Sequence, residues 1–300
     1  MGKRKISRKE FIAATLTGVA SLGIANTGIN PQGNARLRTI GKTGIRVSPL
    51  CFGAPRTNEA SLIKYAIAKG INFIDTGRSY GNGNNEIMVG KAVAGKREEI
   101  VIQTKIRLEY NELPSKGKGR KGSEEIRNAL SSKFEESKKA LNSGYIDMLL
   151  IHDAIEAELL FHPETLKFFT DLRNSGAIKA CGFSCHNDNM NLIERNNAEQ
   201  LYNVVMVPFN PKGSFVHSVN GSYSEWDQEK LIRILGDAGN KGIGVIAMKT
   251  CSGGKYSTAP EREPDYAQAV EWVLKHDFIS SAAVAMASFE QVDMHSRLLL

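Results

Sequence analysis

Four side chains suited to proton transfer follow apolar segments of the sequence. Asp75 ends the run Ile71–Ile74, and Tyr80 lies in the Gly-rich turn that comes next. Lys105 and His152 each come at the end of a further apolar run. A carboxylate, a phenol, an ammonium and an imidazole can move a proton to or from a reacting group if they converge. Each also has a structural explanation: Asp75 could cap a helix, Lys105 could extend into solvent, and His152 could be a hydrogen-bonded core residue.

Alternating strand and helix patterns explain how these side chains could meet. Apolar stretches rich in Val, Ile, Leu and Met, typical of parallel strands buried on both faces, alternate with helical patterns from Ser48 onward. The expected strands span 49–53, 71–75, 99–105, 146–152, 178–184, 203–209, 242–249 and 280–287, and the expected helices span 58–69, 84–94, 123–142, 163–175, 188–198, 225–240, 265–276 and 289–299. Repeated strand–helix units over about 250 residues predict an α/β fold, a (β/α)8 TIM barrel, whose strand ends converge on one site.

Two segments precede the predicted barrel. Residues 36–47 predict an N-terminal β-hairpin around Gly41-Lys42-Thr43-Gly44. Residues 1–30 predict an export signal and linker, because a basic start leads into a weakly apolar run that is too short to span a bilayer. The barrel domain is then expected over 31–300.

The run 7–12, Ser-Arg-Lys-Glu-Phe-Ile, resembles a twin-arginine export signal with Lys9 in place of the second Arg. This resemblance implies that the twin-arginine export machinery moves the folded protein to the periplasm, with no stable membrane anchor. The alternative is an N-terminal extension that stays attached, in which case the protein would remain in the cytoplasm.

Composition narrows the class of function. The formal net charge is +7, but basic residues gather at the N-terminus and in the segment 107–122, with no aromatic interleaving that would mark a nucleic-acid surface. The long loop 107–122 is expected to be a mobile flap over the barrel mouth. The four cysteines lack the paired spacing of a metal site, so free thiols and no metal are expected at Cys51, Cys181, Cys185 and Cys251.

The motifs at the strand ends resemble those of the aldo-keto reductase family. The match runs from residue 36 to about 295 and rests on Gly-Lys-Thr-Gly-Ile-Arg-Val-Ser, Asp-Thr-x3-Tyr-Gly-x-Gly-x2-Glu, Thr-Lys, Ile-His-Asp and Gly-Phe-Ser-x-His. The resemblance implies an NAD(P)-dependent oxidoreductase with the catalytic tetrad Asp75, Tyr80, Lys105 and His152. Tyr80 would be the general acid/base, and Lys105, oriented by Asp75, would lower its pKa. His152 would align the carbonyl or alcohol substrate.

The resemblance also implies a site for NADP or NAD. Ser184 matches the family's Ser that holds the nicotinamide amide, whereas Cys185 and Met206 stand where Asn and Gln are usual. Phe209 is expected to stack on the nicotinamide. The remaining cofactor contacts are expected at Thr250, Cys251, Ser252, Gly253, Gly254 and Ser288. Because no Lys or Arg lies between residues 282 and 291, either cofactor is expected.

Other functions remain open on the sequence alone. The main alternative is a non-catalytic redox sensor or subunit that binds a nicotinamide nucleotide on the same barrel, which the unusual residues Cys185 and Met206 favour and the intact tetrad opposes. A barrel isomerase or hydrolase would need a metal-binding His pair or paired carboxylates, which the strand ends lack. Arg78 and Arg107 would suit a polar or anionic small-molecule substrate, or lie solvated on loops. The family's C-terminal segment, which shapes the substrate pocket, has no match in the residues up to Leu300.

Overall fold

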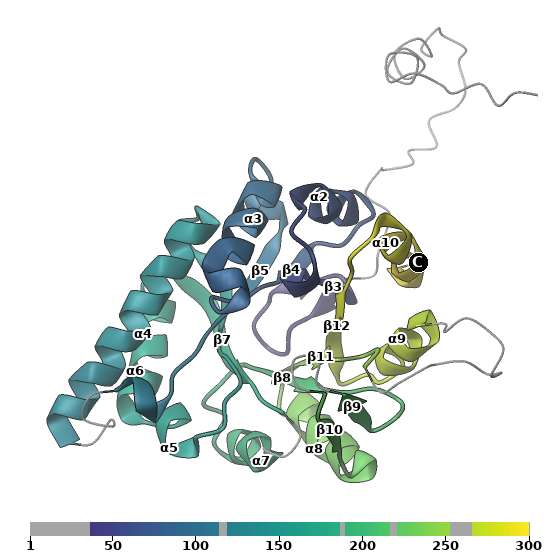
Figure 1. Cartoon of the computed structure of the whole chain (residues 1–300). Helices are drawn as coiled ribbons and strands as arrows, with labels where there is room; N and C mark the ends of the chain where they lie inside the picture. The colour runs from purple at the N-terminus through teal and green to yellow at the C-terminus, as the bar shows by residue number, and fades with distance from the viewer. Residues whose placement is uncertain (1–36, 114–118, 187–189, 217–220, 253–265, 300) are drawn as a thin grey trace, which may run out of the picture. The chain divides into compact units, whose positions relative to one another are not determined.

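Eight parallel strands close into a barrel in the order β11-β12-β3-β4-β5-β6-β7-β8 (Figure 1). This computed structural model describes residues 37–113, 119–186, 190–216, 221–252 and 266–299. The barrel strands are β3 (Leu50–Gly53), β4 (Phe73–Asp75), β5 (Val101–Ile106), β6 (Ile146–Ile151), β7 (Ile178–Ser184), β8 (Val204–Pro208), β11 (Gly244–Met248) and β12 (Ile279–Ala285). The predicted (β/α)8 barrel is confirmed.

Helices surround the barrel (Figure 1). They are α2 (Ala60–Ala68), α3 (Asn84–Val93), α4 (Gly119–Leu141), α5 (Ala157–Leu160), α6 (Pro163–Asn174), α7 (Met190–Glu199), α8 (Gln228–Asn240), α9 (Tyr266–Leu274) and α10 (Phe289–Ser296). Short 3-10 helices are η1 (Ala54–Arg56), η2 (Tyr80–Gly83), η3 (Arg97–Glu99), η4 (Tyr110–Glu112) and η6 (Arg297–Leu299). Pro163 opens α6 and Gly176, with a φ of 74°, follows its end, as the sequence predicts.

Side chains along each strand alternate between the inside of the barrel and the helical layer. On β6, Met148 and Leu150 belong to the cluster that fills the barrel, whereas Leu149 and Ile151 belong to the larger cluster that includes the helices. All four side chains are at most 3% exposed. The barrel is therefore a packed core, and chemistry is confined to its ends.

The N-terminal hairpin closes the amino end of the barrel. Its strands β1 (Arg38–Thr39) and β2 (Arg46–Val47) flank Gly41, which has a φ of 46°. A Cβ on Gly41 would lie 2.3 Å from the Gly242 carbonyl oxygen, so only glycine allows this close approach just before β11. The predicted hairpin is confirmed, and the carboxyl end of the barrel is left for the site.

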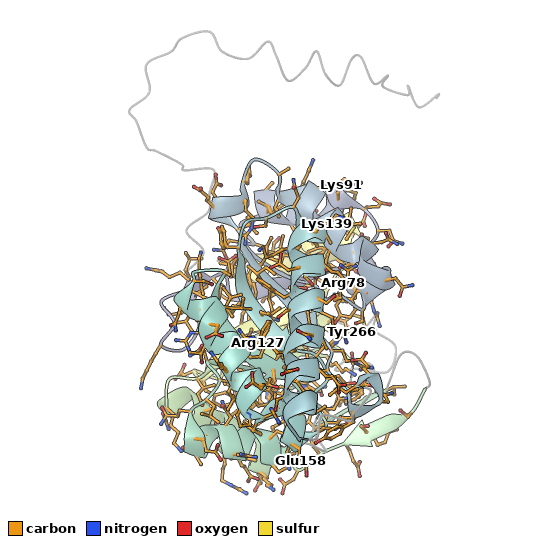
Figure 2. All side chains as sticks on the ribbon, turned by 90° about the vertical axis from the view of Figure 1, so that its left-hand side faces the viewer. Arg78, Lys91, Arg127, Lys139, Glu158 and Tyr266 are labelled. Carbon is orange, nitrogen blue, oxygen red and sulfur yellow. The ribbon has the colours of Figure 1, made fainter. Side chains whose placement is uncertain are left out.

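The long helix α4 packs against α3 and α6 on the outer layer. Arg127 of α4 donates to Asp171 of α6 at 2.6 Å, and Figure 2 shows this face of the molecule. Helix α4 begins at Gly119, earlier than expected, so the expected flap is shorter. The described part of the loop, residues 107–113, is attached to α4, because Lys133 of α4 donates to the Arg107 carbonyl at 2.7 Å. Residues 114–118 lie outside the described part of the chain.

The sequence analysis did not predict the short 3-10 helices, helix α5, or the hairpin of β9 (Ser214–Val216) and β10 (Tyr223–Glu225) in the connection after β8. The barrel belongs to one compact unit, Gln32–Leu300. The predicted export signal, residues 1–30, lies outside the described residues. Among the helices that the structure describes, none has both the length and the apolar character needed to cross a bilayer.

Candidate active site

The four side chains predicted to transfer protons meet at the carboxyl end of the barrel, and we refer to them as the tetrad. Asp75 ends β4, Tyr80 opens η2 in the next connection, Lys105 lies near the end of β5, and His152 directly follows β6. The Lys105 ammonium is 2.5 Å from Asp75 Oδ1 and 5.0 Å from the centroid of the Tyr80 ring. The Tyr80 ring meets the His152 ring edge-on, with centroids 5.4 Å apart.

Lys105 and Asp75 form a buried ion pair beneath the tyrosine. Their side chains are 1% and 4% exposed. Lys105 Nζ also donates to the Thr76 carbonyl at 2.7 Å, and Gln103 Nε2 donates to the same Asp75 oxygen at 2.7 Å. Burial acts to lower the pKa of Lys105, but the charges of Asp75 and Tyr80 outweigh it and the pKa is raised. The ammonium therefore stays charged at neutral pH.

Tyr80 and His152 are half-buried and follow strands β4 and β6 at the carboxyl end of the barrel. Burial raises the pKa of the Tyr80 phenol, and the charge of Lys105 opposes this without cancelling it. From the sequence, Lys105 was expected to lower the pKa of Tyr80. The charge of Lys105 does act in that direction, but burial outweighs it and the pKa of Tyr80 is raised. Burial and the charges of Lys105, Arg107 and His186 hold the pKa of His152 well below its usual value. At neutral pH the site therefore presents a protonated phenol and a neutral imidazole.

The connection that carries Tyr80 is held by buried polar contacts. Thr104 Oγ1 donates to Glu86 Oε1 at 2.6 Å, and Arg78 pairs with the other oxygen of Glu86 at 2.9 Å. Gly83 has a φ of 86°, and a Cβ there would overlap the Arg78 guanidinium at 0.9 Å. The Gly and Glu positions of the Asp-Thr-x3-Tyr-Gly-x-Gly-x2-Glu motif therefore serve to fix the tyrosine. Arg78 is occupied by this contact and is not a free cation for a substrate.

The cofactor residues expected near the nicotinamide amide lie at the same end of the barrel. Ser184 ends β7, and its Oγ accepts from the Asp153 backbone N–H at 2.9 Å, so its own proton can still be donated. Cys185 and Met206 are buried beside it, and Met206 Sδ accepts from Gln103 Nε2 at 3.3 Å. Gln103 Oε1 has no partner among the described residues. The Ser184 hydroxyl can donate a hydrogen bond and Gln103 Oε1 can accept one, so the two groups fit the chemistry of a carboxamide. The resemblance to the family implies amide side chains at positions 185 and 206 instead, where this chain has Cys and Met.

The other expected cofactor residues lie in the turn after β11 and at the start of α10. Thr250, Cys251 and Ser252 follow β11 in a turn closed by Ser252 N–H donating to the Lys249 carbonyl at 3.1 Å. Gly253 and Gly254 lie outside the described residues. Ser288 caps α10 by accepting from the Gln291 N–H at 3.3 Å.

Phe209 does not lie at the mouth. Its ring is 0% exposed and packs within 5.0–5.9 Å of the rings of Trp272, His276 and Phe278 in the outer layer. Because alternate residues face opposite sides of a strand, the position after Pro208 turns away from the barrel interior. This placement contradicts the expected stacking role, since the ring has no exposed face.

Met248 is the residue that the sequence reasoning missed. It ends β11, is partly exposed, and packs against the cluster inside the barrel that contains Met206 and Ile246. Counting two residues on from Ile246 along the strand would have identified it.

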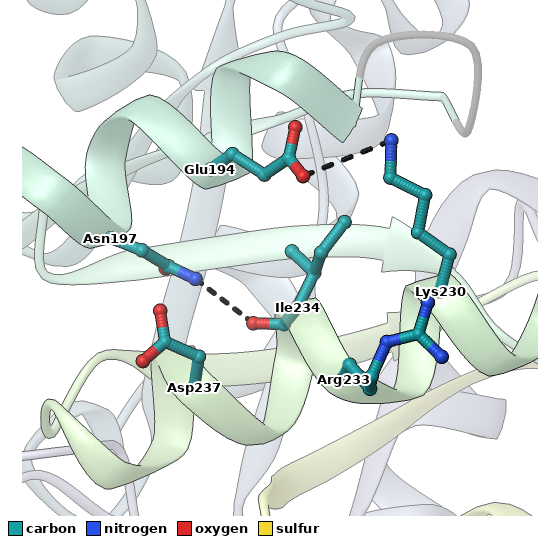
Figure 3. A pocket seen from close by; sticks show the side chains of 6 residues that line it. All are labelled: Glu194, Asn197, Lys230, Arg233, Ile234 and Asp237. Atoms are coloured by element: carbon teal, nitrogen blue, oxygen red, sulfur yellow. Dashed lines mark hydrogen bonds and ion pairs between the residues drawn. The ribbon is translucent and has the colours of Figure 1, made fainter.

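All four cysteines are free thiols, three of them buried, as expected. Within the described ranges, no group of three or more His, Cys, Asp and Glu side chains is placed to hold a metal ion. A separate cavity of about 340 Å³ lies between α7 and α8 (Figure 3). Its lining residues are Glu194, Asn197, Lys230, Arg233, Ile234 and Asp237. No residue of the tetrad lines this cavity, so it is distinct from the candidate active site.

Comparison with known proteins identifies the family of the chain. A family model described as "Aldo/keto reductase family" matches residues 53–294. Aldo-keto reductase YhdN of Bacillus subtilis is 32% identical over 136 residues, which cover 44% of this chain and 38% of that protein. The chain thus spans well under half the length of this curated relative.

Solved structures share the fold. Aldo-keto reductase AKR11C1 from Bacillus halodurans, in its holo form, superposes with a TM-score of 0.66 at 20% identity, over 87% of this chain and 89% of that chain. An aldo-keto reductase from Klebsiella pneumoniae in complex with NADPH gives a TM-score of 0.64 at 19% identity, over 87% and 89% of the two chains.

Proposed function

Because this chain belongs to the aldo/keto reductase family, we propose that it is an NAD(P)-dependent oxidoreductase that interconverts a carbonyl compound and an alcohol. The observation that carries the proposal is the complete tetrad at the carboxyl end of the barrel, with Lys105 paired to Asp75 at 2.5 Å beneath Tyr80. Replacement of Tyr80 by phenylalanine tests it, because turnover should fall while the nucleotide still binds.

The chain's own residues supply the proton and align the substrate. A bound nicotinamide nucleotide would supply the hydride. Tyr80 Oη donates a proton to the oxygen of the carbonyl as negative charge develops there, and the Lys105 ammonium stabilises the phenolate that is left. His152, neutral and linked to Ser79 Oγ at 3.1 Å, donates a hydrogen bond that orients the same oxygen. In the oxidative direction Tyr80 accepts the proton of the alcohol.

The residues that would hold the nucleotide are Ser184, the Gln103 amide and the turn Thr250–Ser252. The Klebsiella pneumoniae aldo-keto reductase that shares this fold is in complex with NADPH, which supports a nicotinamide nucleotide as the cofactor. The substitutions at Cys185 and Met206 keep a second candidate function in view, a non-catalytic sensor that binds the nucleotide. Turnover of any carbonyl substrate that depends on Tyr80 would exclude the sensor.

We expect weak discrimination between NADH and NADPH, or a preference for NADH. Between residues 282 and 291 the chain has no Lys or Arg, and the first turn of α10 carries Glu290. A charge-assisted phosphate contact contributes roughly 1.5–3 kcal/mol, which corresponds to roughly 10- to 100-fold in affinity. Without it, the two dissociation constants should differ by less than about tenfold. Titration with each nucleotide, followed by quenching of Trp226 and Trp272 or by cofactor fluorescence, measures both constants.

A strong preference for NADPH would contradict this expectation. It would point to a basic group from another element, of which Arg56 is the first to test because its charge acts on Cys251 in the turn after β11. Arg56→Met would then abolish the preference, whereas Lys91→Met on α3 serves as a matched removal of a surface charge.

We propose that residues 1–30 are an export signal that directs the folded protein to the periplasm through the twin-arginine machinery. The run 7–12 and the short apolar segment that ends at Ala25 support the proposal. Mass spectrometry of the native protein should find a new N-terminus near residues 25–30, and Arg8→Lys should keep the protein in the cytoplasm at unchanged charge. A wild-type chain that begins at Met1 or Gly2 and stays in the cytoplasm would exclude export.

A further inference from the structure

A lysine on the rim of the barrel mouth, Lys249, places its ammonium against an aromatic ring. Lys249 directly follows β11, and its Nζ lies 3.6 Å from the centroid of the Phe215 ring of β9. Among the residues that the structure describes, this ammonium makes no hydrogen bond or ion pair. Burial lowers the pKa of Lys249 to about 8, although the charge of Asp153 acts in the opposite direction. The ammonium is therefore partly stripped of water without a protein acceptor in exchange.

The backbone holds Lys249 in a conformation that lysine rarely adopts. Its φ is 53°, in the left-handed region that favours glycine or asparagine. Two contacts fix its carbonyl: Ser252 N–H donates to it at 3.1 Å, and Asn210 Nδ2 donates to it at 3.1 Å. The fold thus tolerates local strain at a position where the side chain adds no hydrogen bond of its own. Strain of this kind is frequent where a side chain is aimed at a ligand.

The charged groups nearest to Asp153 on the rim are already paired. Arg107 contacts Asp153 at 2.6 Å and Glu109 at 3.1 Å. His186 Nε2 lies 3.8 Å from the other Asp153 oxygen. The two arginines that the sequence suggested for an anionic substrate are therefore both engaged, since Arg78 is bound to Glu86. Within the described residues the donors of Lys249 stay available on the side of the mouth that Asp153 borders, whereas Arg56 follows β3 and acts on Cys251.

Lys249 and the tetrad border the same residue. Asp153 directly follows His152, and its charge acts on both Tyr80 and Lys249. A small substrate whose carbonyl oxygen contacts Tyr80 and His152 can therefore extend past Asp153 toward the Lys249 ammonium. The Phe215 ring lies against that ammonium but is only 1% exposed, so it positions the lysine rather than lining the substrate.

We propose that Lys249 determines substrate specificity by binding an acidic group, a carboxylate or a phosphate, of the carbonyl substrate. The proposal rests on the proposed oxidoreductase function. An anion would supply the acceptor that the dehydrated ammonium lacks, and charge-assisted hydrogen bonds of this type are among the stronger polar contacts in proteins. The negative charge of Asp153, already paired with Arg107, would not prevent this contact.

The test compares two aldehydes of the same shape, 4-formylbenzoate and its neutral counterpart 4-formylbenzamide. For the wild-type protein we expect kcat/KM to favour the acid by roughly 10- to 100-fold, mainly through KM. Lys249→Met, which keeps the apolar stem, should bring the ratio close to one, and Lys249→Arg should restore part of it. Lys241→Met is the matched control, because Lys241 pairs with Asp237 at 3.0 Å beyond the end of α8, before β11 begins.

Calorimetric titration with the same two aldehydes in the presence of oxidised nucleotide gives a second readout that needs no turnover. Tighter binding of 4-formylbenzoate that is lost in Lys249→Met supports the anion site even if neither aldehyde is reduced, in which case the oxidoreductase proposal alone fails. Equal binding and equal turnover of the two aldehydes by the wild type would overturn the inference. It would also be overturned if Lys249→Met weakened nucleotide binding and left the acid preference intact, because the lysine would then serve a cofactor phosphate.

Discussion

Replacement of Tyr80 by phenylalanine is expected to lower carbonyl reduction by about 10²–10⁴-fold, the range typical of a lost general acid. The ring that packs edge-on against His152 at 5.4 Å is retained, so only the phenol is removed. Nucleotide affinity should stay close to that of the wild type, because the residues proposed to hold the nucleotide lie on other strands. Steady-state rates on a panel of aldehydes, with nucleotide titration of the same preparations, measure both quantities.

Tyr145→Phe provides the matched control for this experiment. Tyr145 precedes β6, at the amino end of the barrel, and its ring lies against Arg97 and Lys179. Removal of the Tyr145 hydroxyl should leave turnover unchanged. If Tyr80→Phe binds nucleotide and keeps near-wild-type turnover on the best substrate, the tetrad assignment is wrong, and a sensor or a different chemistry becomes the better reading.

Lys105→Met should lower activity by a comparable factor and should also destabilise the fold. The substitution leaves the Asp75 carboxylate buried with Gln103 as its remaining side-chain donor, and breaking a buried ion pair in this way costs about 3–5 kcal/mol. The charge that opposes the effect of burial on Tyr80 is also lost, so the pKa of the phenol should rise further. Alcohol oxidation, which needs the phenolate, should then move to higher pH. Urea unfolding and pH profiles of the oxidation rate measure these effects.

The double variant Asp75→Asn/Lys105→Met separates stability from chemistry. Removing both charges should recover much of the free energy of unfolding, because no buried charge is left without a partner. Activity should stay low, and adding Tyr80→Phe should lower it little further, since Tyr80 and Lys105 act as one proton-delivery unit. Recovery of turnover together with stability would show that Lys105 has only a structural role.

The barrel and the placement of the tetrad could be predicted because both depend on local pattern. Apolar runs alternating with helical segments indicate parallel strands, and the carboxyl ends of such strands share one end of the barrel. Asp75, Lys105 and His152 each stand where such a run ends, and the structure brings them together with Tyr80.

Side-chain partners across strands could not be predicted in the same way. Gln103 donates to Asp75 because the register of β4 and β5 places the two residues opposite each other, and a single sequence does not specify that register. The raised pKa of Tyr80 depends on burial in the folded barrel and on the charges of Lys105, Asp75 and Asp153, which only the fold brings together. The hairpin of β9 and β10 was missed because each strand is three residues long and carries too short a pattern to recognise.

Phe209 shows the opposite error, in which the information was present in the sequence. An aromatic residue at the end of the sixth barrel strand suggested stacking, but strand alternation from the inward-facing Met206 predicts that position 209 faces outward. Residue type alone was given more weight than its position along the strand.

The buried contacts that fix residues 76–86 have a consequence for how this protein could change. Thr76 donates to Asn85 at 2.7 Å, and Glu86 binds both Thr104 and Arg78, so a substitution among them disturbs the placement of Tyr80. Across the mouth, the side chain of Lys249 makes no hydrogen bond or ion pair to any described residue. After random mutagenesis and selection on a new aldehyde, we therefore expect the beneficial substitutions to lie around position 249. Residues 76–86 should keep their wild-type identities. New substrate preferences would then arise in this barrel without loss of its proton-delivery chemistry.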